Sequence, residues 1–170
     1  GMTTSGIFEI KKFGSKVLLY GTHDMYPDGI PKDAIDRIFQ NREKPLGKLK
    51  DDILNFLRSW DRDVHRATIR REYFSSEEEI EKELDREVSN DFREIKPSDI
   101  PKNIEKYWNY MYLVDLDTRT VTILYPKEFF HYDGVVVNPV TEVYGEKAVK
   151  LCTCGLENYA KIADYLEYLL

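Results

Sequence analysis

The residues best suited to chemistry lie in one loop, residues 22–29, with the sequence THDMYPDG. His23 can act as a base or a metal ligand near neutral pH, and Asp24 can orient it or join it on a divalent cation. These two are the candidate catalytic residues. Tyr26 and Asp28 are candidate binding residues, because a phenol can stack on a ring or donate to an anion and a carboxylate can bind a cation.

Ordinary loop chemistry explains the same side chains. Pro27-Asp28-Gly29 is a typical turn sequence, in which proline fixes φ and glycine supplies a positive φ. Asp24 can accept hydrogen bonds from the loop backbone, and His23 can be a packing residue. Both interpretations remain open from the sequence.

A second short segment, residues 131–134, again places a histidine and an aspartate before a glycine. His131 and Asp133 are therefore candidate binding residues. If the two loops met, these residues would form with His23 and Asp24 a cluster of two imidazoles and two carboxylates. Such a set could hold zinc, iron or manganese, and the sequence does not identify a metal or any other cofactor.

Several familiar enzyme classes lack their motifs here. The chain has no glycine-rich phosphate loop, no GxSxG, no HExxH and no EF-hand. Cys152 and Cys154 stand one residue apart, too close for a zinc knuckle, and are expected to be small buried side chains. A vicinal redox or metal pair is the alternative. With two cysteines and no signal-peptide pattern, we expect a reducing, cytoplasmic location.

The net charge of the chain limits the partners that it is expected to bind. A formal net charge of -6 argues against general affinity for nucleic acid or an anionic membrane. Arg62, Arg66 and Arg70 would form a basic stripe on a helix, for which a solvated face is the ordinary interpretation. No segment approaches the ~20 apolar residues that a membrane span requires.

Hydrophobic patterning predicts the elements that position the loop. A hairpin is expected over 7–20, a helix from Pro31, and a second helix through 49–60. Ser76 and Glu79 form a capping box at the start of an acidic helix. That helix carries a thin apolar stripe: Ile80, Leu84, Val88, Phe92.

The second half of the chain predicts more strands. Residues 107–117 and 120–125 should form a hairpin, followed by a short strand at 135–137. A helix is expected from Leu156 onward. Ile162, Tyr165 and Leu169 widen its apolar face, which indicates deep burial or contact with a partner, including a second copy of the chain.

The loop resembles a motif of small uncharacterised bacterial and phage-borne proteins. In them a strand with an aromatic residue ends in a sequence like His-Trp-Asp-Gly-Tyr-Pro-Glu-Gly. The counterpart at residues 22–29 lacks the tryptophan, and Met25 stands where those proteins favour glycine. Residues 108–115 also resemble a strand of those proteins. The resemblance implies an α+β fold and no assigned activity, and the backbone at Met25 would differ if glycine serves a positive φ there.

The sequence as a whole predicts one α+β domain over residues 2–170. Its sheet should be mostly antiparallel with about five strands, packed with helices, plus an acidic helical insertion over 61–103. Twelve tyrosines and the lack of a complete catalytic set favour a binding or interaction domain that uses the 22–29 loop, with a small ligand or a protein as partner. The alternative is a metal-dependent or His/Asp hydrolase with its site at the same loop.

Overall fold

The computed structural model describes residues 4–96, 98, 109–126, 138–140 and 148–166. The strands are β1 (Gly6–Lys12), β2 (Ser15–Gly21), β3 (Phe92–Ile95), β4 (Tyr110–Asp115), β5 (Thr120–Pro126), β6 (Asn138–Val140) and β7 (Ala148–Gly155). The helices are α1 (Ile30–Gln40), α2 (Leu46–Thr68), α3 (Glu77–Asp91) and α5 (Tyr159–Leu166), with short 3-10 turns η1 (Arg71–Tyr73) and η5 (Leu156–Asn158).

The strands form one seven-stranded sheet in the order β3-β2-β1-β4-β5-β7-β6. Among the described strands, β1 and β4 alone pair in parallel, so the α+β fold and the mostly antiparallel sheet are confirmed. The prediction of about five strands was too low. The sequence did not predict β3, because Phe92 also continues the apolar stripe of α3. The strand expected at 135–137 lies outside the described residues.

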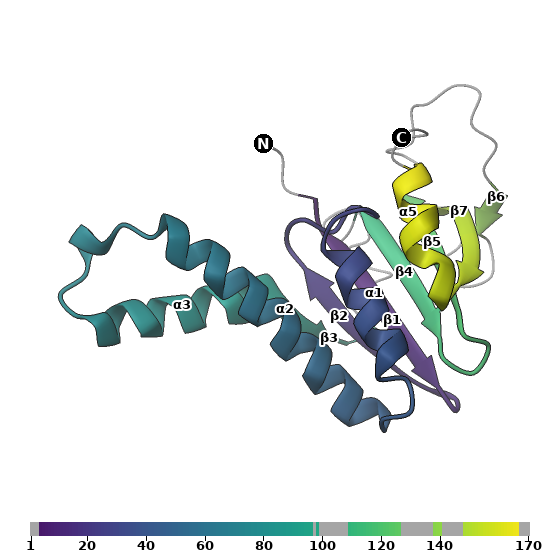
Figure 1. The fold of residues 1–170 in the computed structure, drawn as a ribbon, viewed down its shortest axis with the longest axis horizontal. Coiled ribbons are helices and arrows are strands. Elements are labelled where there is room, and N and C mark those ends of the chain that lie inside the picture. The colour runs from purple at the N-terminus through teal and green to yellow at the C-terminus, as the bar shows by residue number, and fades with distance from the viewer. Residues whose placement is uncertain (1–3, 97, 99–108, 127–137, 141–147, 167–170) are drawn as a thin grey trace.

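Helices α1 and α5 lie across one face of the sheet, and α2 and α3 run side by side and extend away from it (Figure 1). The main core joins this helical layer to the sheet, with Phe8, Leu19 and Tyr112 pointing inward from the strands. Leu18 and Met111, which alternate with those residues along the strands, belong to a smaller cluster on the opposite face. None of the helices in the described ranges combines the length and the apolar character that a bilayer crossing needs.

Helix α2 is longer than the sequence indicated, because residues 61–68, which were ambiguous, continue it. The predicted capping box begins α3: Ser76 Oγ accepts the Glu79 N–H at 3.2 Å, and the Glu79 carboxylate reaches back to the Ser75 N–H at 2.7 Å. The range 61–103, predicted as a helical insertion, also contains β3, whose pairing with β2 anchors the end of α3 to the sheet.

Candidate metal centre

The loop at residues 22–29 connects β2 to α1 and is fixed by hydrogen bonds from buried side chains. The buried hydroxyls of Tyr112 and Tyr159 donate hydrogen bonds to the carbonyls of Met25 and Pro27. The Met25 side chain is fully buried, and its N–H donates to the Thr4 carbonyl at 3.0 Å. A loop pinned by buried contacts of this kind can hold a neighbouring side chain in a fixed direction.

The backbone of the loop differs from the sequence-based interpretation. Gly29 has a φ of -86° rather than a positive φ. It is glycine for lack of space, since a Cβ atom would lie 2.5 Å from the Asp24 carbonyl oxygen. The left-handed residue is Asp24, with a φ of 58°. Met25 therefore does not stand at a position that needs a positive φ.

His23 points from this loop toward α2 and α3. Its Nε2 lies 2.8 Å from Asp61 Oδ1 and 3.6 Å from Asp91 Oδ2. The imidazole packs beside Trp60 and Phe92, with ring centroids 5.7 and 5.5 Å away. These rings fix the orientation of the imidazole and limit water around it.

Asp61 and His65 come from α2, one turn apart on the same face. Asp61 continues the buried stripe of Leu54 and Leu57, and its side chain is completely inaccessible. One oxygen, Oδ1, pairs with His23, but Oδ2 has no hydrogen-bond partner among the described residues. Oδ2 lies 3.4 Å from His65 Nε2, so this oxygen has an ion-pair contact but no hydrogen bond within the described structure. A buried carboxylate oxygen without a hydrogen bond is costly and requires an explanation.

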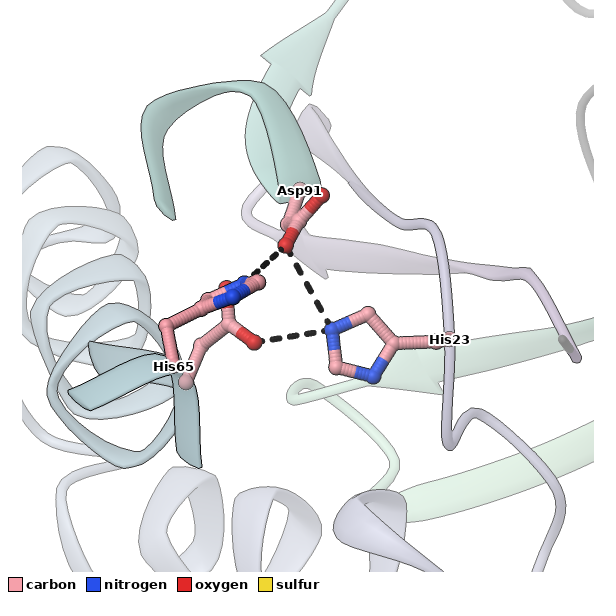
Figure 2. Close-up of side chains that lie close together, drawn as sticks. His23, His65 and Asp91 are labelled. Atoms are coloured by element: carbon pink, nitrogen blue, oxygen red, sulfur yellow. Dashed lines mark hydrogen bonds and ion pairs between the residues drawn. The ribbon is translucent and has the colours of Figure 1, made fainter. Parts of the chain in front are cut away.

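Asp91 closes the cluster from the last residue of α3. Its Oδ2 lies 2.7 Å from His65 Nε2, and its Oδ1 accepts a hydrogen bond from the Thr22 hydroxyl at 3.2 Å. Figure 2 shows His23, His65 and Asp91 converging from the loop, α2 and α3, with dashed lines from Asp91 to both imidazoles. The Thr22 hydroxyl therefore fixes Oδ1 of Asp91, and Oδ2 points into the cluster.

Together His23, Asp61, His65 and Asp91 present four ligand atoms that all lie within 4.8 Å of one another. Tetrahedral coordination with bonds of about 2.0–2.2 Å places neighbouring ligand atoms roughly 3.3–3.6 Å apart. Asp91 Oδ2 lies 3.6 Å from His23 Nε2, and Asp61 Oδ2 lies 3.4 Å from His65 Nε2, which already match. The pair of Asp91 Oδ2 and His65 Nε2, at 2.7 Å, needs to open by less than 1 Å. The 2.8 Å contact of His23 Nε2 is to the other oxygen of Asp61, Oδ1.

Each histidine is also held on its outer side by a second carboxylate. His23 Nδ1 lies 2.9 Å from Asp24 Oδ2, and His65 Nδ1 lies 2.8 Å from Glu87 Oε2. A proton on Nδ1 that is donated outward leaves Nε2 as the lone-pair nitrogen that faces the cluster. Metal-binding histidines are usually oriented by an outer carboxylate in this way.

The carboxylates shift the titration of both imidazoles. The hydrogen bond to Asp61 raises the pKa of His23 to about 9, against an opposing effect of burial. Burial lowers the pKa of His65, but its hydrogen bond to Asp91 and the charges of Asp61 and Glu87 outweigh this and raise it. Burial raises the pKa of Asp61. Burial also acts to raise the pKa of Asp91, but its hydrogen bonds with His65 and Asp61 and the charge of His23 outweigh burial and lower it. The raised pKa values of His23 and His65 favour protonated imidazoles, whose positive charge balances that of the carboxylates.

The other predicted site residues have different positions. Asp24 supports His23, and the Tyr26 hydroxyl donates to Asp24 at 3.3 Å. Asp28 is half-buried and outside the cluster. His131 and Asp133 lie outside the described residues, so the cluster predicted across the two loops stays a prediction.

Two further sequence features have structural roles in the described chain. Arg62 forms ion pairs with Glu81 and Asp85 of α3, and Arg66 pairs with Glu81 at 2.8 Å, so these two arginines of the basic stripe are neutralised. Cys152 and Cys154 are free thiols packed, partly buried, against the main core. Tyr165 of α5 is exposed, Ile162 packs on the core, and Leu169 lies outside the described residues.

Sequence reasoning missed Asp61, His65 and Asp91. The available signal was a charged residue, Asp61, in line with the apolar stripe of α2, with a histidine four residues later on the same face. Comparison with known proteins found no matching family model, no curated relative and no similar solved structure. The site is therefore interpreted from its own geometry.

Proposed function

We propose that this protein binds one divalent transition metal ion through His23, Asp61, His65 and Asp91. The observation that carries the proposal is the buried Asp61 Oδ2, which has no hydrogen-bond partner in the described structure. Such an atom costs about 1–3 kcal/mol of desolvation. A cation among the four ligand atoms would satisfy it and replace the positive charge that the two imidazoliums now supply.

The donor set indicates which metals suit the site. Two imidazole nitrogens and two carboxylate oxygens favour zinc or another first-row ion such as manganese or iron over calcium and magnesium, which prefer oxygen alone. Asp24 and Glu87, each bonded to the outer nitrogen of a histidine, support the same assignment. Zinc is the first ion to test.

Hydrolysis at this centre is a second candidate function, and it rests on the bound metal. It is favoured by partial access: the side chains of His23, His65 and Asp91 are 20, 26 and 19% exposed, while Asp61 is fully buried. Because four protein ligands complete a tetrahedral shell, a reactive water molecule would need a fifth position on the solvent side. A five-coordinate ion there could lower the pKa of that water for attack on an ester or phosphodiester.

The contact surface predicted at the same loop has less support. Tyr112 and Tyr159 are buried and hold the loop from inside, so they offer nothing to a partner. Tyr26 remains as the exposed aromatic residue of the loop. A protein partner at this loop would therefore have a small aromatic anchor.

The metal proposal is tested by titrating chelator-treated protein with Zn²⁺, Mn²⁺, Fe²⁺ and Co²⁺, followed by calorimetry and thermal unfolding. An ion at about 100 times its dissociation constant should stabilise the wild type by ~2.7 kcal/mol. Asp61→Asn and His65→Gln, which conserve size, should lose most of this stabilisation. Asp52→Asn is the matched control, because Asp52 lies on the same helix but pairs with Arg37 at 2.9 Å.

His131→Ala separates the two metal clusters. Full metal binding in this variant assigns the site to the four residues described above, whereas loss of binding would support the cluster predicted from the sequence. Failure of all four ions to bind the wild type, or equal binding by Asp61→Asn, would overturn the metal proposal.

Hydrolysis is then tested on zinc-loaded protein with chromogenic esters and phosphodiesters. Turnover that survives chelation or Asp61→Asn would exclude this centre as its source.

A further inference from the structure

A cavity lies at the opposite end of the sheet from the metal centre. It has a volume of about 440 Å³ and is lined by Lys12, Phe13, Arg42, Glu43, Leu116, Asp117 and Arg119. We call it the hairpin-end cavity. Its lining comes from three connections: the β1–β2 turn, the β4–β5 turn and the α1–α2 loop, which meet at the lower edge of the sheet in Figure 1. The volume is in the range of small-molecule sites.

Hydrogen bonds tie these three connections together. Leu116 N–H donates to the Lys11 carbonyl at 2.9 Å, and Phe13 N–H donates to the Asp117 carboxylate at 3.1 Å. The Lys12 ammonium donates to the carbonyls of Arg42 and Lys44 at 2.7 and 2.8 Å. The cavity walls are therefore held in place by the fold.

Phe13 is the unusual residue of this cavity. It occupies a two-residue hairpin turn with a φ of 50°, followed by Gly14 with a φ of 80°. A turn with two positive φ values favours Asn-Gly, and a bulky residue in the first position is strained. The phenyl ring is 84% exposed, so packing does not offset the strain. An exposed aromatic ring on a strained but anchored turn points to a contact outside the fold.

Three cations line this cavity although the chain as a whole is acidic: Lys12, Arg42 and Arg119. The Lys12 ammonium lies 5.7 Å from the Phe13 ring centroid. The Arg42 guanidinium is fixed in position, 4.3 Å from the centroid of Phe39 and bonded to the Phe39 carbonyl at 2.9 Å. Arg119 is exposed. Of the two acidic residues, Asp117 accepts a hydrogen bond from the Phe13 N–H, and Glu43 lies 3.9 Å from Arg42 Nε, so a bound phosphate would compete with Glu43 for this guanidinium.

We infer that the hairpin-end cavity binds a small aromatic anion of the mononucleotide type. The base would stack on Phe13, and the phosphate would be met by Arg42 and Arg119. Stacking on an aromatic side chain accepts every base, and guanidinium groups suit phosphate. This site does not depend on the metal centre, because none of its residues belongs to the four metal ligands.

The experiment is a titration of the wild type, in the presence of a chelator, with AMP, GMP, CMP and UMP, monitored by NMR shifts. Adenosine and inorganic phosphate are titrated separately. We expect the monophosphates to bind more tightly than either part alone. Binding of phosphate alone with the same strength as AMP would overturn the role of Phe13. Dissociation constants weaker than about 1 mM for every monophosphate would overturn the proposal as a whole.

Two variants test the residues without disturbing the turns. Phe13→Asn places a favoured residue at the strained position, so the melting temperature should hold or rise while AMP affinity falls by about tenfold or more. Arg119→Asn suits its φ of 58° in the same way and should weaken AMP binding but not adenosine binding. Tyr73→Ala, at another exposed aromatic residue beside an arginine, is the control. Unchanged AMP affinity in Phe13→Asn would refute the assignment.

Discussion

Replacing Asp61 by asparagine removes one charge from the centre of the cluster and tests how its charges are balanced. Asp61 Oδ1 lies 2.8 Å from His23 Nε2. This contact is the main reason that the pKa of His23 is raised from 6.5 to about 9. An asparagine side chain at this position would keep the shape and an acceptor oxygen but would no longer hold an imidazolium.

The size of the expected change in unfolding free energy follows from the raised pKa of His23. A difference of 2.5 between the pKa of His23 in the folded chain, about 9, and its ordinary value of 6.5 corresponds to about 3 kcal/mol. Because the folded-state pKa is the higher one, this stabilisation is complete below pH 6.5 and is lost as the pH rises through 9. Burial, which raises the pKa of Asp61, acts against the pair. We therefore expect Asp61→Asn to lower the free energy of unfolding by at most about 3 kcal/mol near pH 6, and by much less near pH 10.

Urea unfolding with a chelator present, at several pH values from about 6 to 10, measures this difference. An NMR titration of His23 in both proteins provides the pKa directly. In a His23→Gln background the pH-dependent part of the Asp61→Asn effect should vanish, since its titrating partner is gone. A loss that is equal at both ends of the pH range, or a wild-type His23 that titrates near 6.5, would refute the reasoning.

Three further predictions follow from neighbouring contacts. Glu87→Gln removes the outer carboxylate of His65 and should weaken zinc binding about 10–100-fold without abolishing it, as calorimetry can measure. Zinc binding near pH 7.5 should release about one proton from His23, whose pKa is about 9, and a further fraction from His65, whose pKa is also raised, because both imidazoles must be neutral to bind. The release is visible as a buffer-dependent enthalpy. Tyr112→Phe leaves the buried Met25 carbonyl without its hydroxyl donor and should cost about 1–3 kcal/mol in urea unfolding. It should also weaken zinc binding through the loosened loop.

Local signals in the sequence were sufficient to predict several elements of the fold. Ser76 and Glu79 act within one turn, so the capping box predicted the start of α3. Pro31 lies in the first turn of α1 as expected. The hairpin β1–β2 followed from alternation and a glycine turn. These features depend on neighbours in the chain, and a single sequence contains them in full.

The site depended on contacts between distant segments, which local patterns do not contain. His23 was identified from its loop, but its partners come from α2 and from the end of α3. The spacing of Asp61 and His65 was visible as i and i+4. Its significance appears only when Asp61 is known to face the core, where a carboxylate needs partners. Asp91 looked like one more charge on an acidic helix.

The short strand β3 explains how these segments meet. Pairing of Phe92 with Gly21 extends the sheet by one strand beside β2. The same register brings Asp91 next to Thr22, whose N–H donates to the Asp91 carbonyl at 2.9 Å. The backbone bonds that close this edge of the sheet therefore also place the Asp91 carboxylate beside His23. A metal held there would connect the loop, α2 and α3 at one point. Its binding free energy would therefore stabilise the attachment of α2 and α3 to the sheet.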